Sequence, residues 1–429
     1  MDKIFVQLAS YRDPELLPTI TDMLDKADNP DQFTFGICWQ YGPEETPNIF
    51  DGKKEYRVTK VPFEKSEGLG WARNVTNTLY GGEKYTLQLD SHHRFAEHWD
   101  TMLLEDYHQA LKKSNKPVIS TYCTPFNPTK PIDNFAPCLM SQYEYSYDKL
   151  LMSMPWYIQD YKTRTEVIRA RTISGHFYFV NGEFIKEVPY DPDIYFGGYT
   201  EETTLSVRAF THGYDFYSPY RQYIWHEYTR NYRRKHWDDH GTSKSTGKTS
   251  GERDIFARKK TRQLFNQESH GIDMGQYGLG TVRTLRDYEI FGGFDFNKCR
   301  IQDYTLQVKE PPNPPDYENQ FISKQFIIQC DWDAEHFLKE KNESELEFLT
   351  FGIETQSGLN IFRNDFLPDK APEKTTFKDN RFLAKFKAID KPYKIVMYAY
   401  WKDRGWGERY EKQLGTIQPV ELNSSIRTT

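Results

Sequence analysis

The alternation of apolar runs with amphipathic segments over residues 1–121 is the strongest constraint on the fold. Apolar runs typical of buried strands cover residues 4–9, 33–39, 56–61, 84–89 and 117–121. Segments with apolar residues at helical spacing lie between most of these runs. Strands that alternate with helices at short intervals predict an α/β fold with a doubly wound, mostly parallel sheet.

The last part of the chain has a different pattern. Lys309-Glu-Pro-Pro-Asn-Pro-Pro-Asp316 predicts a stiff proline-rich linker. We therefore expect an α/β domain over residues 1–308, a linker over 309–316 and a smaller β-rich domain over 317–429. Short strand-like runs separated by turns predict a small antiparallel sandwich in this last domain, at residues 325–330, 348–353, 382–386 and 393–400.

Two segments interrupt the α/β pattern of residues 1–308. Residues 123–160 are rich in Pro, Asn, Ser and Tyr, which predicts an irregular insertion over the rim of the sheet. Residues 241–252 are polar and punctuated by glycine, which predicts a mobile loop or lid. The tripeptide Gly247-Lys248-Thr249 resembles a phosphate-binding loop only superficially, because it does not follow a buried strand.

Composition excludes several classes of protein. The 62 acidic residues slightly outnumber the 56 basic ones, which argues against a general nucleic-acid binder. The 5 cysteines lie far apart without a CxxC pair, so we expect neither a disulfide framework nor a thiolate zinc site. We see no signal peptide before the first strand-like run and no transmembrane segment, so we expect a cytoplasmic protein.

The tripeptide Asp90-Ser91-His92 indicates a metal site. It follows the buried run 84–89, at the edge of the sheet where α/β domains bind phosphorylated ligands. A carboxylate and an imidazole two residues apart can both reach one divalent cation. Such a cation neutralises phosphate charge and makes the phosphate a better leaving group, so the motif suits a diphosphate ligand.

A third metal ligand has to come from elsewhere in the chain. Of the 11 histidines we choose His226, because it ends the run 222–225 and precedes a basic stretch that could fold across a diphosphate. That stretch contains Arg230, Arg233 and Arg234. A rival pair is His236 and His240, spaced as on a zinc-binding helix face, but no HExxH pattern accompanies them and we expect a solvated pair.

Two further motifs suit a ligand that carries a diphosphate. Gly68 and Gly70 allow close approach of backbone to the ligand, and N–H groups at a helix start attract anions. Arg73 on the first turn can bind phosphate oxygens in bidentate fashion, although a surface ion pair is the simpler interpretation of one arginine. Glu201 and Glu202 either complement a helix dipole or contact donor hydroxyls or the acceptor nucleophile.

Four segments together resemble a known family. They are Val6-Gln-Leu-Ala-Ser-Tyr-Arg-Asp13, Gly68-Leu-Gly-Trp-Ala-Arg73, Leu87-Gln-Leu-Asp-Ser-His92, and Gly197-Gly198 through Glu201-Glu202 and Arg208 to His226. They are similar to metal-dependent, retaining polypeptide α-N-acetylhexosaminyltransferases of the GT-A fold. Cytoplasmic N-acetylglucosaminyltransferases that modify hydroxyproline on a ubiquitin-ligase adaptor are the nearer kin, and mucin-type N-acetylgalactosaminyltransferases are more distant. The resemblance covers roughly residues 1–230.

The resemblance implies a role for each matched position. Asp90, His92 and His226 would bind Mn²⁺ or Mg²⁺. The expected donor-binding residues are Ser10, Tyr11, Arg12, Gly70, Arg73 and Arg230, with the first three lining the uridine pocket. Glu201 or Glu202 would contact the donor sugar or the acceptor. The C-terminal domain does not look like the lectin domain of the mucin-type enzymes.

The implied function is transfer of N-acetylglucosamine, or a close analogue, from a UDP-sugar to a hydroxyl of a protein acceptor with retained configuration. Two alternatives stay open. One is a transferase whose acceptor is a glycan. The other is a non-catalytic sugar-nucleotide or carbohydrate-binding protein that uses its C-terminal sandwich as the binding module.

Overall fold

The computed structural model divides the chain into two compact units, Met1–Tyr317 and Glu318–Thr429. It describes residues 2–46, 48–132, 136–146, 148–195, 198–229, 232–243, 245–321, 324–331, 346–366, 381–388, 390–402 and 405–416. The segment 309–316, expected as a linker, lies in the first unit. There Arg171 donates to the carbonyl of Lys309 and to Asn313 Oδ1, both at 2.7 Å.

An eight-stranded sheet with the order β10-β12-β6-β11-β4-β1-β2-β3 forms the centre of the first unit. Its strands are β1 (Ile4–Tyr11), β2 (Phe33–Tyr41), β3 (Tyr56–Pro62), β4 (Tyr85–Asp90), β6 (Pro117–Ser120), β10 (Ile168–Ala170), β11 (Phe177–Asn181) and β12 (Asp215–Ser218). The pairs β1–β2, β2–β3, β1–β4 and β6–β12 are parallel, whereas β10 and β11 run antiparallel to their neighbours. The predicted mostly parallel sheet is confirmed.

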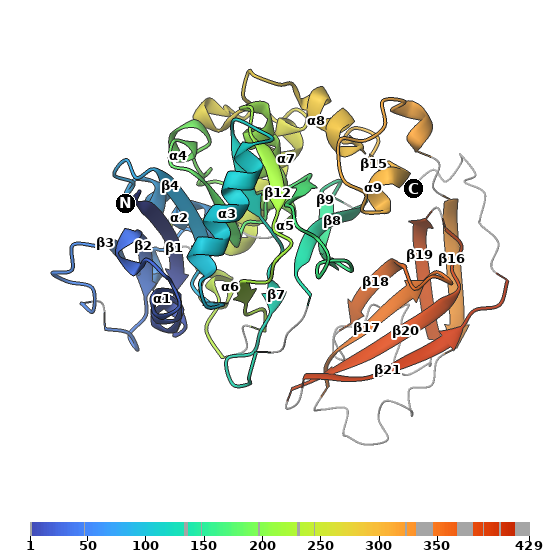
Figure 1. Ribbon diagram of the computed structural model, residues 1–429, viewed down its shortest axis with the longest axis horizontal. Coiled ribbons are helices and arrows are strands. Elements are labelled where there is room, and N and C mark those ends of the chain that lie inside the picture. The colour runs from blue at the N-terminus through green and yellow to red at the C-terminus, as the bar shows by residue number, and fades with distance from the viewer. Residues whose placement is uncertain are drawn as a thin grey trace. The chain divides into compact units, whose positions relative to one another are not determined.

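Helices cover both faces of this sheet (Figure 1). On one face, α1 (Leu16–Asp25) and α3 (Trp99–Leu111) share a core with β1, β4 and Phe179 of β11. Because side chains alternate along a strand, the neighbouring Tyr178 points to the other face. It joins a core formed with α5 (Gly198–Thr211), α7 (Ser250–Leu264) and α8 (Leu285–Gly292). On that second face α2 (Leu69–Asn77) packs on β1 and β2, so the sheet is doubly wound as predicted.

A three-stranded sheet lies beyond the end of β4. It has the order β5-β13-β7 and consists of β5 (His93–Phe95), β13 (Ile224–His226) and β7 (Thr124–Pro125). β5 begins three residues after β4 ends, and it pairs antiparallel with β13 so that His93 lies opposite His226. This pairing brings a segment from late in the unit next to Asp90-Ser91-His92.

The prediction that residues 123–160 are irregular is wrong in one respect. Residues 123–160 contain an antiparallel hairpin formed by β8 (Cys138–Tyr145) and β9 (Leu151–Tyr157). Pro155 obscures this strand in the sequence, but β9 pairs only with β8 among the described strands, so the missing N–H does not break a central ladder. The hairpin packs on α5 and on α9 (Asp303–Leu306).

The sequence pattern gave no indication of α7. Its first turn is fixed by a capping box, in which Thr249 Oγ1 accepts from the N–H of Glu252 and Glu252 accepts from the N–H of Thr249. The hydroxyl of Thr249, in the tripeptide that superficially resembles a phosphate-binding loop, therefore caps the N-terminus of α7. The remaining short elements of the unit are α4 (Phe184–Glu187), α6 (His236–His240), β14 (Phe294–Asp295) and β15 (Arg300–Ile301).

The second unit consists of antiparallel sheets, as predicted. One has the order β18-β17-β20-β21, with β17 (Leu346–Glu354), β18 (Asn360–Phe366), β20 (Lys394–Trp401) and β21 (Gly405–Gln413). The other pairs β16 (Lys324–Asp331) with β19 (Arg381–Ala388). Alternate side chains of these strands, such as Leu349, Phe351 and Met397, form a core of their own. The sequence pattern did not indicate β18 and β21.

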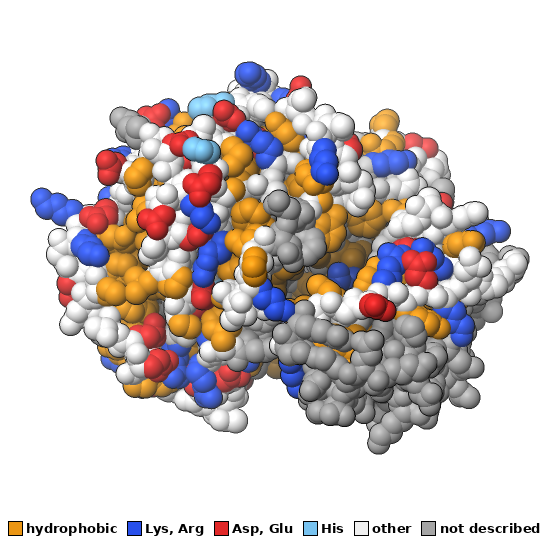
Figure 2. Space-filling model, turned by 60° about the horizontal axis from the view of Figure 1, so that its bottom comes forward, with side chains coloured by type: hydrophobic (Ala, Val, Ile, Leu, Met, Phe, Trp, Pro, Cys, Tyr) orange, Lys and Arg blue, Asp and Glu red, His pale blue; other side chains and the backbone are white. Residues whose placement is uncertain are grey.

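Acidic and basic side chains are interspersed on the face shown in Figure 2, in keeping with the formal net charge of −6. None of the helices in the described part of the chain combines the length and the apolar character that crossing a bilayer requires.

Candidate functional site

Asp90, His92 and His226 meet at the carboxyl end of β4. One ligand atom from each of them lies within 4.8 Å of the others, and no other such group of three was found among the described residues. Asp90 Oδ2 is 3.2 Å from His226 Nε2 and 3.7 Å from His92 Nε2. Neighbouring ligands of an octahedral cation with bonds near 2.1 Å lie roughly 3 Å apart. The three side chains predicted from the sequence therefore fit one divalent ion.

The buried nitrogens of this cluster support the same conclusion. His92 Nδ1 is 2.8 Å from Asp13 Oδ2, which leaves His92 Nε2 buried without a hydrogen-bond partner. Burial lowers the pKa of His226 well below its usual value, so this ring is neutral near pH 7 and has a lone pair to offer. Two imidazoles and a carboxylate form a donor set suited to a divalent transition-metal ion.

Arg73 stabilises the charge of Asp90. Its Nη2 lies 2.6 Å from Asp90 Oδ1, and the guanidinium is 1% exposed. Burial by itself would raise the pKa of Asp90, but Arg73 and His226 outweigh it and hold the pKa well below the usual value. Asp90 is thus ionised at neutral pH, with Oδ1 bound to Arg73 and Oδ2 directed at the two histidines.

The two adjacent glutamates have different environments. Glu201 is ion-paired with Arg73 and accepts a hydrogen bond from Tyr190 OH at 3.1 Å. Glu202 accepts from the N–H of Gly175 at 3.2 Å, and no basic side chain among the described residues forms an ion pair with it. Arg73 therefore connects Asp90 to Glu201, whereas Glu202 lies in a less polar setting.

The residues expected around uridine lie beside α6. Tyr11 OH donates to Asp239 Oδ2 at 2.8 Å, and Arg12 Nη1 donates to the same oxygen at 3.0 Å. The Tyr11 ring lies 5.1 Å from that of His236. Ser10 is fully buried, and its hydroxyl has no partner. In this conformation, Tyr11 and Arg12 use their polar atoms to hold α6.

The rival pair His236 and His240 does not form a metal site. The rings are stacked with centroids 4.1 Å apart, and no described acidic or cysteine side chain completes a ligand group with them. His236 Nδ1 lies 2.7 Å from Tyr195 OH, and His240 Nε2 lies 3.0 Å from the carbonyl oxygen of Phe63. Contrary to the expectation of a solvated pair, His240 is buried.

Arg230 and Gly70 were also expected to bind the donor. Arg230, like Gly197, lies outside the described residues. Gly70 lies in the first turn of α2, where an added Cβ would be 2.1 Å from the carbonyl oxygen of Ile194. Glycine at position 70 therefore allows two chain segments to pack closely, and its contact with the donor stays a prediction.

Comparison with known proteins shows to which family the chain belongs. A profile of the glycosyltransferase (GlcNAc) family matches residues 3–54 and 51–298, which is more than half of the chain. The chain belongs to this glycosyltransferase family. A comparison with curated protein sequences found no significant match.

This glycosyltransferase is also similar to solved structures of low sequence identity. One is a crystal structure of GalNAc-T7 with UDP, GalNAc and Mn²⁺, at 15% identity and a TM-score of 0.46, covering 68% of this chain and 57% of that one. Another is S. aureus TarS 1–349 in complex with UDP-GlcNAc, at 16% identity and a TM-score of 0.35, covering 55% and 60%. This chain thus spans 57% and 60% of the lengths of those two chains.

Sequence reasoning missed three side chains that organise the site. Asp13 binds His92, Tyr190 binds Arg73 and Glu201, and Asp239 binds Tyr11 and Arg12. Asp13 ends the matched segment 6–13, but no role was predicted for it, and no role was predicted for Tyr190 or Asp239. The one available clue was the occurrence of these polar residues next to matched motifs.

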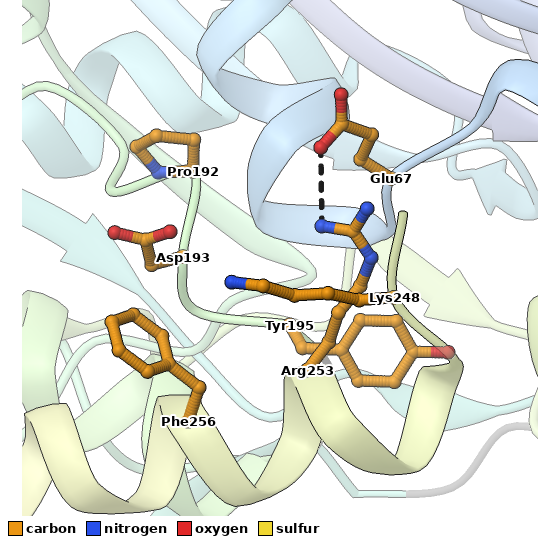
Figure 3. A pocket seen from close by; sticks show the side chains of 7 residues that line it. All are labelled: Glu67, Pro192, Asp193, Tyr195, Lys248, Arg253 and Phe256. Carbon is orange, nitrogen blue, oxygen red and sulfur yellow. Dashed lines mark ion pairs between the residues drawn. The ribbon is translucent and has the colours of Figure 1, made fainter. Parts of the chain in front are cut away.

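A small pocket opens beside the start of α2 (Figure 3). It is lined by Glu67, Pro192, Asp193, Tyr195, Lys248, Arg253 and Phe256. Arg253 is paired with Glu67 at 3.1 Å, and Lys248 lies over the ring of Phe256, 4.8 Å from its centroid. Lys248 belongs to the predicted loop 241–252, so this loop contributes a cation to the pocket wall.

The buried carboxyl group of Glu202 should make the stability of the fold depend on pH, and Glu202→Gln should remove this dependence. Burial raises the pKa of Glu202 from 4.5 to about 7. An acid with a raised folded-state pKa stabilises the fold below its unfolded pKa and loses that contribution as pH rises to the folded value. At ~1.4 kcal/mol per unit, this loss is roughly 3 kcal/mol between pH 4.5 and 7.

Urea unfolding of the wild type and Glu202→Gln at pH 5 and pH 8 measures this effect. The glutamine variant should gain stability relative to the wild type as the pH rises. Asp238→Asn, which alters a carboxylate that is 30% exposed, is the control and should show no such gain. A constant difference between the wild type and Glu202→Gln at both pH values would contradict the assignment.

Proposed function

We propose that this protein is a divalent-metal-dependent, retaining transferase that moves N-acetylglucosamine from UDP-N-acetylglucosamine to a hydroxyl of a protein acceptor. The observation that carries the proposal is the meeting of Asp90, His92 and His226 at the carboxyl end of β4, in a chain of this family. This edge of an open α/β sheet is where nucleotide ligands bind. A GT-A-type fold is part of the proposal.

The residues around the diphosphate would act mainly by electrostatics. A bound Mn²⁺ would neutralise the charge that develops on the leaving diphosphate. Asp90, His92 and His226 would hold that ion. Because Arg73 already binds Asp90 and Glu201, its part is to fix the charge and orientation of Asp90. Its direct contact with the donor stays a prediction.

The carboxylates of the site favour transfer without a covalent sugar–enzyme intermediate. Glu201 is engaged by Arg73 and Tyr190, and the raised pKa of Glu202 keeps this buried acid largely protonated below neutral pH. Neither is a free nucleophile. In the proposed step, the bond from C1 of the sugar to the β-phosphate oxygen breaks as the acceptor oxygen bonds to C1 on the same face. The acceptor proton passes to an oxygen of the departing UDP.

The protein acceptor and the cytoplasmic location are inferred from features of the sequence. Support for the acceptor comes from the resemblance of segments 6–13, 68–73, 87–92 and 197–226 to polypeptide transferases. Support for a reducing compartment comes from Cys38, Cys123 and Cys138, which are buried as free thiols.

A donor screen tests the proposed function. Purified protein is mixed with a panel of UDP-sugars and Mn²⁺, and release of UDP is followed with and without a chelator. We expect slow release from UDP-N-acetylglucosamine that falls by at least an order of magnitude when the chelator removes the metal. Tight binding of UDP-N-acetylglucosamine without any UDP release, with or without candidate acceptor proteins, would indicate a binding protein instead.

A further inference from the structure

Asp13 is a buried carboxylate with contacts to four other residues. It is 2% exposed and lies just after β1. Its Oδ2 accepts a hydrogen bond from Ser91 Oγ at 2.7 Å, lies 2.8 Å from His92 Nδ1 and is 3.4 Å from Arg233 Nε. Its Oδ1 accepts from the N–H of Glu15 at 3.0 Å. Asp13 thus joins the start of the chain to the turn that carries two of the proposed metal ligands.

The contact with Asp13 selects one form of the His92 ring. The Oδ2 atom of Asp13 accepts from Ser91 Oγ and faces Arg233 Nε at 3.4 Å, a setting that favours the ionised carboxylate. An ionised carboxylate can only accept hydrogen bonds, so Nδ1 of His92 has to carry the proton. In the neutral ring, the lone pair is then on Nε2, the atom directed toward Asp90 Oδ2 at 3.7 Å.

Ser91 has a specific part in this arrangement. Its hydroxyl donates to the same oxygen of Asp13 that binds His92, so the middle residue of Asp90-Ser91-His92 is not merely a spacer. Its carbonyl oxygen accepts from Thr19 Oγ1 of α1 at 3.0 Å. The turn after β4 is therefore held from one side by residues 13–19.

We infer that Asp13 is a positioning residue for the proposed metal centre, which fixes the tautomer and the orientation of His92 so that Nε2 faces the ion. Carboxylates that accept the second N–H of a metal-bound histidine typically contribute 10–100-fold to metal affinity. The inference rests on the proposed function, because it concerns a ligand of the metal that function requires. It adds a residue that does not itself contact the ion or the substrate.

A suitable substitution has to separate this role from a second one. Asp13 also accepts from the N–H of Glu15 at the start of α1, so Asp13→Ala would remove a helix-start hydrogen bond as well. Asp13→Ser keeps a side-chain acceptor of the kind preferred there, but its hydroxyl is too short to replace the carboxylate at His92. Asp13→Asn keeps one oxygen that can accept the Nδ1 proton, but it loses the charge and replaces the other oxygen by an NH₂ donor.

The experiment titrates the full-length protein with Mn²⁺ in saturating UDP and follows free Mn²⁺ by electron paramagnetic resonance. We expect Asp13→Ser to bind Mn²⁺ about 10–100-fold more weakly than the wild type. Asp13→Asn should lie between the two. Thermal unfolding without metal is the check on folding: both variants weaken the buried contact with Arg233 and lose some stability, but each should still unfold in one cooperative transition.

Asp100→Ser is the matched control. Asp100 is also a buried carboxylate, and it accepts from the N–H groups of Asp28 and Asn29. These residues lie shortly before the start of β2, whereas the proposed metal ligands lie at the carboxyl end of β4. We expect this variant to lose thermal stability and keep its Mn²⁺ affinity. Equal Mn²⁺ affinity of Asp13→Ser and the wild type would overturn the role of Asp13 alone. Absence of Mn²⁺ binding by the wild type would overturn the metal centre of the proposed function as well.

Discussion

Replacing Asp90 by Asn is expected to lower UDP release from UDP-N-acetylglucosamine by a factor on the order of 10³ or more, since loss of one electrostatic contact to the transition state alone typically costs 10²–10³. Asn has nearly the same shape, but it offers the proposed ion no negative charge and leaves Arg73 opposite a neutral group. The rate of UDP release at saturating Mn²⁺ and donor measures the effect.

The fitting control for Asp90→Asn is Asp215→Asn. Asp215 is also an acidic residue paired with an arginine, here Arg169 at 2.5 Å, but it begins β12 at the other edge of the sheet. Its replacement should leave UDP release within a few-fold of the wild type. If Asp90→Asn retained a large part of the wild-type rate while remaining folded, Asp90 would not hold the metal.

Replacing Arg73 by Met is expected to lower the free energy of unfolding by about 3–5 kcal/mol. The guanidinium is 1% exposed, binds Asp90 Oδ1 at 2.6 Å and Tyr190 OH at 2.8 Å, and is ion-paired with Glu201. Methionine fills much of the same volume but leaves two carboxylates close together without their cation. The midpoints of urea unfolding curves give the difference in the free energy of unfolding. An unchanged slope of the transition would show that unfolding remains two-state.

Two further variants make the Arg73 prediction specific. Adding Glu201→Gln to Arg73→Met removes one of the two unpaired charges and should recover part of the lost stability. Lys84→Met breaks an ion pair with Asp2 in which the side chains are 54% and 57% exposed, and should cost less than 1 kcal/mol. An Arg73→Met variant as stable as Lys84→Met would show that Arg73 does not neutralise the carboxylates of the site.

Local sequence patterns were sufficient to predict five strands of the large sheet, namely β1, β2, β3, β4 and β6. The strands at 4–9, 33–39, 56–61 and 84–89 are apolar runs bounded by turn residues, so each strand could be recognised without its neighbours. The hairpin of β8 and β9 could not, because Pro155 and many polar residues hide its pattern. Helix α7 is polar around most of its surface and carries no strong apolar stripe, so it also went unrecognised.

For the site, sequence patterns could indicate side chains but not their tertiary partners. The structure brings Asp90, His92 and His226 together as expected, although their roles remain predictions. The partners depend on contacts between distant segments. Asp13 lies 79 positions from His92, Tyr190 lies 117 from Arg73, and Asp239 lies 228 from Tyr11. No local periodicity reports on pairs so far apart.

The pairing of β13 with β5 makes the site sensitive to the length of the chain. His226 lies opposite His93, and a strand that slips by one residue turns each of its side chains to the opposite face. A single deletion among residues 219–223 would therefore be far more harmful than most point substitutions there, since it would direct the His226 imidazole away from Asp90. Functional members of the family that share this centre should keep a constant spacing between the ends of β12 and β13.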